Sequence, residues 1–331
     1  MNQIPPALHP AYDWKFEQNE KEVIVTFQFP PTFNIHSFQA NLTNDNQCIR
    51  CDAPNHIPFL CGHLNSPADS INVEFLEDSN TVNLHIIKSK EEVWKIVIQS
   101  FTPQTGEIDP KSAFLIFSVL SNQDVSDEIK DSIAALLKSS AQAGYVPALL
   151  TFGNICIKLE TVQHVGFSML QTAAEMYQSP EAFCHLGSFM LRQNEIEQGL
   201  IMLNESLRMG YTNAALIIGR TLSPFSPLPS LEKKNGQKAL EMFEKCPLPD
   251  SKYEMAKILI KGCEGVPEDS ERAKKLYSEA KAELPQLPPL EEVIAKAENK
   301  EQGVNGIMVV AAGVVAVFGF ILYNHVKRYR K

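Results

Sequence analysis

Apolar side chains occupy every second position in several short stretches of the first hundred residues. The first stretch contains Val23, Val25, Phe27 and Phe29, with polar residues between most of them. The later stretches are Ile71-Val73-Phe75, Val82-Leu84-Ile86 and Trp94-Ile96-Ile98. Clusters of Pro, Asn and Asp separate them. Alternation of period two predicts half-buried strands, and short strands at this spacing predict an antiparallel β-sandwich.

The apolar period becomes helical from about residue 125. Ile129, Ile133 and Leu136 share one face of a predicted helix. A repeat follows, in which the first helix of each copy contains a small residue that recurs after 34, 32 and 37 residues. These small residues are Gly153, Gly187, Gly219 and Ala256, and the second helices contain Gly166, Gly199, Ala239 and Ala273. Such periods predict stacked helix pairs. A proline-rich insertion, residues 223–236, is expected to loop out.

The C-terminal part contains 18 consecutive residues, 306–323, without a charged side chain. As a helix they would span about 27 Å, near the lower limit for crossing a bilayer. A buried core helix is the alternative. The basic tail that follows contains the candidate targeting residues Lys327, Arg328, Arg330 and Lys331.

We expect no signal peptide before this predicted anchor, because residues 1–20 lack a basic and an apolar region. We therefore expect a single-pass, tail-anchored membrane protein with its N-terminal part in the cytosol. The short span and basic tail favour the outer membrane of mitochondria or mitochondrion-derived organelles. The endoplasmic reticulum is the second choice.

Composition narrows the class of protein. The net charge is -9, which argues against a nucleic-acid partner. Seven cysteines in 331 residues are too few for a disulfide scaffold. No nucleophile-base set, phosphate loop or dinucleotide fingerprint is present, so we predict no enzyme activity and no cofactor.

The predicted sandwich resembles a CS domain of the NudC type over roughly residues 10–110. The matching pieces are Tyr12-Asp13-Trp14, EVIVTFQFP, the Gly-x-Leu at Gly62, and TVNLHIIKSKEEVWKIVI with Trp94. TGEIDPKS resembles the NudC-type extension, whereas Lys95 replaces the second tryptophan of the usual pair. The resemblance implies a chaperone-associated, client-stabilising module without catalysis, in which Trp14, Gly62 and Trp94 are structural.

The last helical copy resembles a Sel-like repeat, a relative of the tetratricopeptide repeat. It contains Gly265-Val266, Asp269, Arg272-Ala273, Leu276-Tyr277 and Ala280 at the family spacing. The resemblance implies a concave face, lined by the first helices, that binds peptides or proteins.

That face is predicted to be basic. The position after each small residue and the position four further on share one helix face. Five of these eight residues are basic and none is acidic. The predicted partner-binding residues are Asn154, Lys158, Arg192, Arg220, Lys257 and Lys261. They could hold an acidic C-terminal peptide, in the manner of a carboxylate clamp. The alternative is that they are solvated surface charges.

Five residues of the sandwich invite a zinc interpretation: Cys48, Cys51, His56, Cys61 and His63. However, residues three apart on a strand point to opposite faces, and no second C-x-x-C knuckle exists. We therefore predict no metal site. Redox chemistry is disfavoured too, since no helix follows the cysteine pair.

The predicted fold is multidomain: an antiparallel β-sandwich of CS type, an α-helical repeat solenoid and one C-terminal transmembrane helix. Its segments are a tail (1–10), the sandwich (11–103), connecting helices (104–138), repeats (139–284), a linker (285–305), the membrane helix (306–323) and the basic tail (324–331). The leading hypothesis is a tail-anchored, co-chaperone-like adaptor that binds a chaperone or client protein. The alternative is an organelle fission or import adaptor, with the CS domain as scaffold.

Overall fold

The computed structural model describes residues 10–103, 105–123, 126–290 and 292. They fall into two compact units that divide within one helix, after Ala173. In this part of the chain no helix combines the length and apolarity needed to cross a bilayer. The predicted membrane helix (306–323) and basic tail (324–331) lie outside the described residues, as do residues 1–9.

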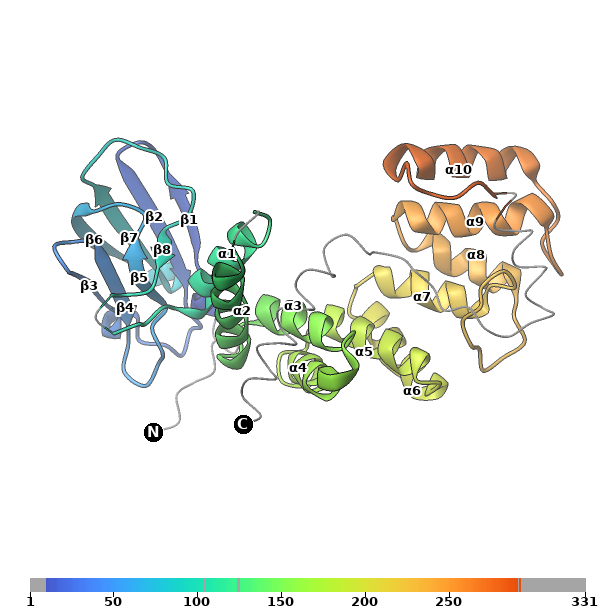
Figure 1. The fold of residues 1–331 in the computed structure, drawn as a ribbon, viewed down its shortest axis with the longest axis horizontal. Helices are drawn as coiled ribbons and strands as arrows, with labels where there is room; N and C mark the ends of the chain where they lie inside the picture. Colours follow the sequence, from blue (N-terminus) through green and yellow to red (C-terminus); the bar gives the residue numbers. More distant parts are fainter. Residues whose placement is uncertain (1–9, 104, 124–125, 291, 293–331) are drawn as a thin grey trace. The chain divides into compact units, whose positions relative to one another are not determined.

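The described residues of the first unit contain eight strands in two four-stranded sheets (Figure 1). One sheet has the order β1-β2-β7-β6 and the other β3-β4-β5-β8, with antiparallel pairing throughout. The strands are β1 (Lys15–Gln18), β2 (Glu22–Gln28), β3 (Gln39–Thr43), β4 (Cys48–Asp52), β5 (Leu60–Leu64), β6 (Ala68–Leu76), β7 (Thr81–Lys88) and β8 (Ile98–Ser100). The predicted antiparallel sandwich is confirmed.

The core of the sandwich follows from the alternation. Val23, Val25 and Phe27 on β2 are fully buried, whereas the residues between them are only half-buried. Val25 pairs with Leu84 of β7, which is equally buried. Burial of each such side chain stabilises the fold by about 1.5–3 kcal/mol relative to exposure. The inward-facing apolar positions therefore fix the register of the central strands.

One predicted strand is wrong. Trp94, Ile96 and Ile98 alternate in the sequence, but β8 begins only at Ile98, and the residues before it form a loop. The loop is held by side chains instead of a strand ladder. The Gln18 amide accepts from the Trp94 backbone N–H at 2.8 Å and donates to the Trp94 carbonyl at 2.7 Å. The buried Lys88 ammonium donates to Gln18, to the carbonyl of Asn19 and to that of Glu92.

Asp109 joins the sandwich to the first helices. It is 1% exposed and is the N-cap of α1 (Pro110–Leu120). Its carboxylate accepts from the backbone N–H groups of Cys61 at 3.0 Å and Ser112 at 2.9 Å. Helix α2 (Asp127–Gln142) packs on α1, and its Ser140 hydroxyl donates to the Pro110 carbonyl. Burial raises the pKa of Asp109 from 3.8 to about 6, although these hydrogen bonds oppose the shift.

The raised pKa of Asp109 predicts that the stability of the fold depends on pH. The folded state holds the Asp109 proton more tightly than the unfolded state, so acidification from pH 6 to pH 4 favours folding at this group. At about 1.4 kcal/mol per pKa unit, the gain over this interval is about 2 kcal/mol, and it approaches about 3 kcal/mol only below pH 4. Urea unfolding of the wild type and of Asp109→Asn measures this gain. The difference between their free energies of unfolding should change with pH over this range, because the contributions of all other carboxylates are the same in both proteins. A difference that does not change with pH would contradict the assignment.

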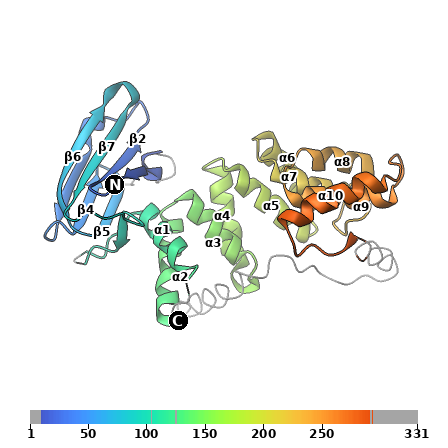
Figure 2. The same cartoon turned by 90° about the horizontal axis from the view of Figure 1, so that it is seen from above.

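The helices of the predicted repeats are confirmed. The first helices are α3 (Val146–Cys156), α5 (Pro180–Arg192), α7 (Asn213–Leu222) and α9 (Pro249–Lys261). The second helices are α4 (Gln163–Glu175), α6 (Ile196–Arg208), α8 (Gly236–Glu244) and α10 (Ser270–Glu283). Figure 2 shows the last pair, α9 and α10, lying side by side.

The recurring small residues let the two helices of a pair approach closely. A Cβ atom on Gly187 would lie 2.6 Å from the Gly199 carbonyl oxygen and 2.7 Å from Leu203 Cγ. In the third pair, α7 and α8, the small residue Gly219 makes room for the Phe243 ring instead of for a backbone carbonyl. Overpacking of this kind typically costs about 1–3 kcal/mol. The period seen in the sequence is therefore a packing requirement.

Two segments of the second unit lie against its core. The proline-rich insertion does not simply loop out: Ser223 and Ser226 are buried, and Phe225 packs on the cluster containing Met255 and Leu259. The segment after α10 folds back, and the hydroxyls of Tyr253 and Tyr277 donate to the Pro288 carbonyl. Leu290 is buried beside Tyr253, so this part of the predicted linker covers the end of the array.

Candidate partner-binding face

Three first helices of the second unit have a basic residue in the last turn. Arg192, Arg220 and Lys261 stand in the last turns of α5, α7 and α9, and we call them the basic rim. Cations are favoured at helix C-termini because the helix dipole places partial negative charge there. The basic pattern found in the sequence therefore has a local structural cause, whatever its function.

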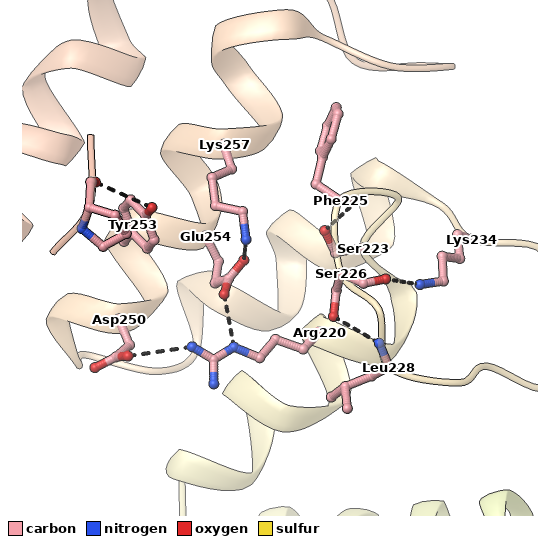
Figure 3. A network of polar contacts seen from close by, with 11 residues as sticks. Arg220, Ser223, Phe225, Ser226, Leu228, Lys234, Asp250, Tyr253, Glu254 and Lys257 are labelled. Carbon is pink, nitrogen blue, oxygen red and sulfur yellow. Dashed lines mark hydrogen bonds and ion pairs between the residues drawn. The ribbon is translucent and has the colours of Figure 1, made fainter. Parts of the chain in front are cut away.

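Arg220 reaches from α7 to α9 and binds two carboxylates there (Figure 3). Its Nε donates to Glu254 Oε1 at 2.9 Å, and its Nη2 donates to Asp250 Oδ1 at 3.4 Å. The Lys257 ammonium donates to the other oxygen of Glu254 at 2.6 Å. These four side chains, two basic and two acidic, are the α7–α9 network.

Lys257, one of the predicted partner-binding residues, is buried. Its side chain is 8% exposed, and its ammonium lies 5.6 Å from the centre of the Tyr253 ring. The sequence pattern included only the residue after each small residue and the residue four positions later. It therefore missed Glu254, which precedes Ala256 by two positions. The Glu254-Lys257 spacing of three on one helix was the available signal.

The other predicted partner-binding residues lie in different settings. Arg192 is exposed and its guanidinium lies 5.9 Å from the centre of the Phe189 ring. Lys261 is exposed at the end of α9. Asn154 is half-buried on α3 and Lys158 is exposed just after it, but both belong to the first unit. The structure therefore defines a shared site only for Arg220 and Lys257.

The predicted structural residues of the sandwich are buried. Trp14 and Trp94 are each 1% exposed, and the ammonium of Lys111 lies 5.1 Å from the centre of the Trp14 ring. Gly62 has φ +148° on β5, and a Cβ there would lie 2.4 Å from Ile98 Cγ2 on β8. A side chain at residue 62 would therefore separate the two strands. The targeting residues Lys327, Arg328, Arg330 and Lys331 lie outside the described residues.

The cysteines of the sandwich lie inside it. Cys48 and Cys51 are buried on β4, and Cys61 is buried on β5. Burial raises the pKa of the Cys51 thiol well above its ordinary value and that of Cys61 to about 11. Such thiols are protonated at neutral pH and poorly reactive. Among the residues that the structure describes, no group of three or more His, Cys, Asp or Glu is placed to hold a metal ion.

The chain matches no protein-family model and no curated protein sequence. Solved structures similar to it include a nuclear movement protein from E. cuniculi (14% identity, TM-score 0.22, 26% of this chain and 96% of that one). The CS domain of the human KIAA1068 protein is 17% identical, with TM-score 0.24 and coverage of 30% and 84%. A Sel1 repeat protein from Oxalobacter formigenes is 16% identical, with TM-score 0.42 and coverage of 52% and 73%.

Proposed function

We propose that this chain is a protein-interaction adaptor that binds acidic segments of partner proteins at the basic rim of its helical array. The supporting observation is that three successive first helices each have a basic residue in the last turn. Two of these, Arg192 and Lys261, are exposed, and Arg220 is 24% exposed. A carboxylate bound there would make charge-assisted hydrogen bonds, each worth about 1.5–3 kcal/mol. The proposed role is binding without catalysis.

Charge reversal at the rim tests this proposal. The double variant Arg192→Glu/Lys261→Glu should bind a ten-residue acidic peptide with a free C-terminus at least tenfold more weakly than the wild type. Wild-type binding should also weaken as salt rises, because rim charges are screened by ions. Isothermal titration of the full-length chain in detergent measures both effects.

The matched control reverses two exposed lysines on a second helix, Lys274→Glu/Lys275→Glu on α10. It introduces the same change in net charge at residues that are not part of the basic rim. Equal losses in the two double variants, or no loss in either, would contradict a binding site at the rim.

More specifically, we propose that the chain is a tail-anchored, co-chaperone-like adaptor. This proposal is supported by the CS-type residues Trp14, Gly62 and Trp94, which are placed where a sandwich needs them. Capture of partners from a detergent extract tests it. Chaperones among the captured proteins would support it, whereas fission or translocation machinery would favour the alternative adaptor.

The membrane anchor is proposed from the 18 uncharged residues at 306–323 and the basic residues after them. Deletion of residues 303–331 should release the chain from membranes into the alkali-soluble fraction, while the full-length chain stays in the pellet. A truncated chain that still resists alkali would contradict the anchor. The location of a tagged full-length chain would decide between the mitochondrial outer membrane and the endoplasmic reticulum.

A further inference from the structure

Arg220 uses two edges of its guanidinium, and the two edges meet different environments. The Nε edge faces Glu254, whose side chain is 7% exposed. The Nη2 edge faces Asp250, whose side chain is 35% exposed, at the longer distance of 3.4 Å (Figure 3). We call these the inner and outer edges of Arg220.

The inner edge of Arg220 is not available to a carboxylate of a partner protein. Both oxygens of Glu254 are used, one by Arg220 and the other by Lys257 at 2.6 Å. Lys257 and Glu254 are nearly inaccessible to solvent. Removal of one member of such a buried pair leaves an uncompensated charge, which is strongly unfavourable. The inner edge therefore holds α7 against α9.

The outer edge is different because its bond is long and its carboxylate is partly exposed. Guanidinium groups bind carboxylates best through two parallel N–H bonds near 2.7–2.9 Å. The contact with Asp250 falls short of this geometry. A carboxylate with more freedom to approach can therefore form stronger bonds at the same edge.

We propose that Asp250 is an internal competitor at the outer edge of Arg220, and that a carboxylate of an acidic partner binds the array by displacing it. This inference rests on the proposed binding of acidic segments at the basic rim. Asp250 lowers partner affinity in two ways. It occupies the donor, and its own charge repels the incoming carboxylate.

The test measures affinity for the same ten-residue acidic peptide in the full-length chain. Asp250→Asn should raise the affinity about fivefold, because the amide binds Arg220 less strongly and carries no charge. In the Arg220→Gln background the same substitution should raise the affinity less than twofold, since the donor for which Asp250 and the peptide compete is gone. This double-mutant cycle separates the Arg220 contact from general effects.

The matched control is Glu271→Gln, which removes an exposed acidic residue from the first turn of α10, whereas Asp250→Asn removes a partly exposed one from the first turn of α9. It should leave the affinity within twofold of the wild type. If Asp250→Asn lowers the melting temperature, Asp250→Ser replaces it, because serine is favourable near a helix N-terminus.

The outcomes separate the two proposals. No rise in Asp250→Asn, or an equal rise without Arg220, overturns the internal competitor while rim binding stands if Arg192→Glu/Lys261→Glu still loses affinity. An affinity insensitive to the rim residues, or no peptide binding in any chain, overturns both.

Discussion

Replacement of Trp94 by alanine is expected to lower the free energy of unfolding of the sandwich by about 3–5 kcal/mol. The indole is 1% exposed, its Nε1 donates to Glu92 at 3.2 Å, and the Lys88 ammonium lies 5.3 Å from its centre. Truncation leaves a cavity and removes the contacts of the ring with Lys88 and Glu92. Hydrogen exchange of the β2 and β7 amides should accelerate roughly a hundredfold or more.

The neighbouring Val93 provides the control, because its side chain is 68% exposed. Val93→Ala should leave exchange of the same amides nearly unchanged, since surface substitutions usually change stability by less than about 0.5 kcal/mol. A loss under about 1 kcal/mol in Trp94→Ala would contradict the buried position and make Trp94 a candidate for a binding surface.

Replacement of Glu254 by alanine is expected to destabilise the second unit by about 3–5 kcal/mol, the usual cost of breaking a buried ion pair. It leaves Lys257 almost inaccessible and without its carboxylate, and removes the inner contact of Arg220. Hydrogen exchange of the α9 backbone amides in the full-length chain should accelerate as a result of this loss of stability.

Asp250→Asn is the matched substitution, because it removes the outer carboxylate of the same arginine. It should cost less than about 1 kcal/mol, because the contact is long and both side chains are partly exposed to solvent. Equal losses in the two variants would contradict the distinction between the inner and outer edges of Arg220.

The repeating parts of the fold could be predicted from the sequence because each has a single physical cause. Alternation at Val23, Val25 and Phe27 follows from one buried sheet face. The recurrence of Gly153, Gly187 and Gly219 follows from the close approach of paired helices. Both causes act over a few residues and repeat along the chain. They therefore produce a periodic pattern that is visible in a single sequence.

The features that the sequence did not reveal depend on long-range contacts. The loop before β8 is held by Gln18, which is 76 positions before Trp94, and by Lys88, which binds Gln18 across 70 positions. The α7–α9 network joins Arg220 to a carboxylate 34 positions later. The pattern identified the basic residues, but it could not show that acidic neighbours already bind two of them, Arg220 and Lys257.

The central claim is that the first helices of the array, at their basic ends, form the partner-binding face. Photo-crosslinking in cells tests it most directly, with a benzophenone amino acid at Ser188, four positions before Arg192 on α5, or at the exposed Asn204 on α6. The account predicts crosslinked partner proteins from position 188 that disappear in Arg192→Glu/Lys261→Glu, and few or none from position 204. Crosslinks that form equally at both positions, or that persist in the double variant, would contradict it.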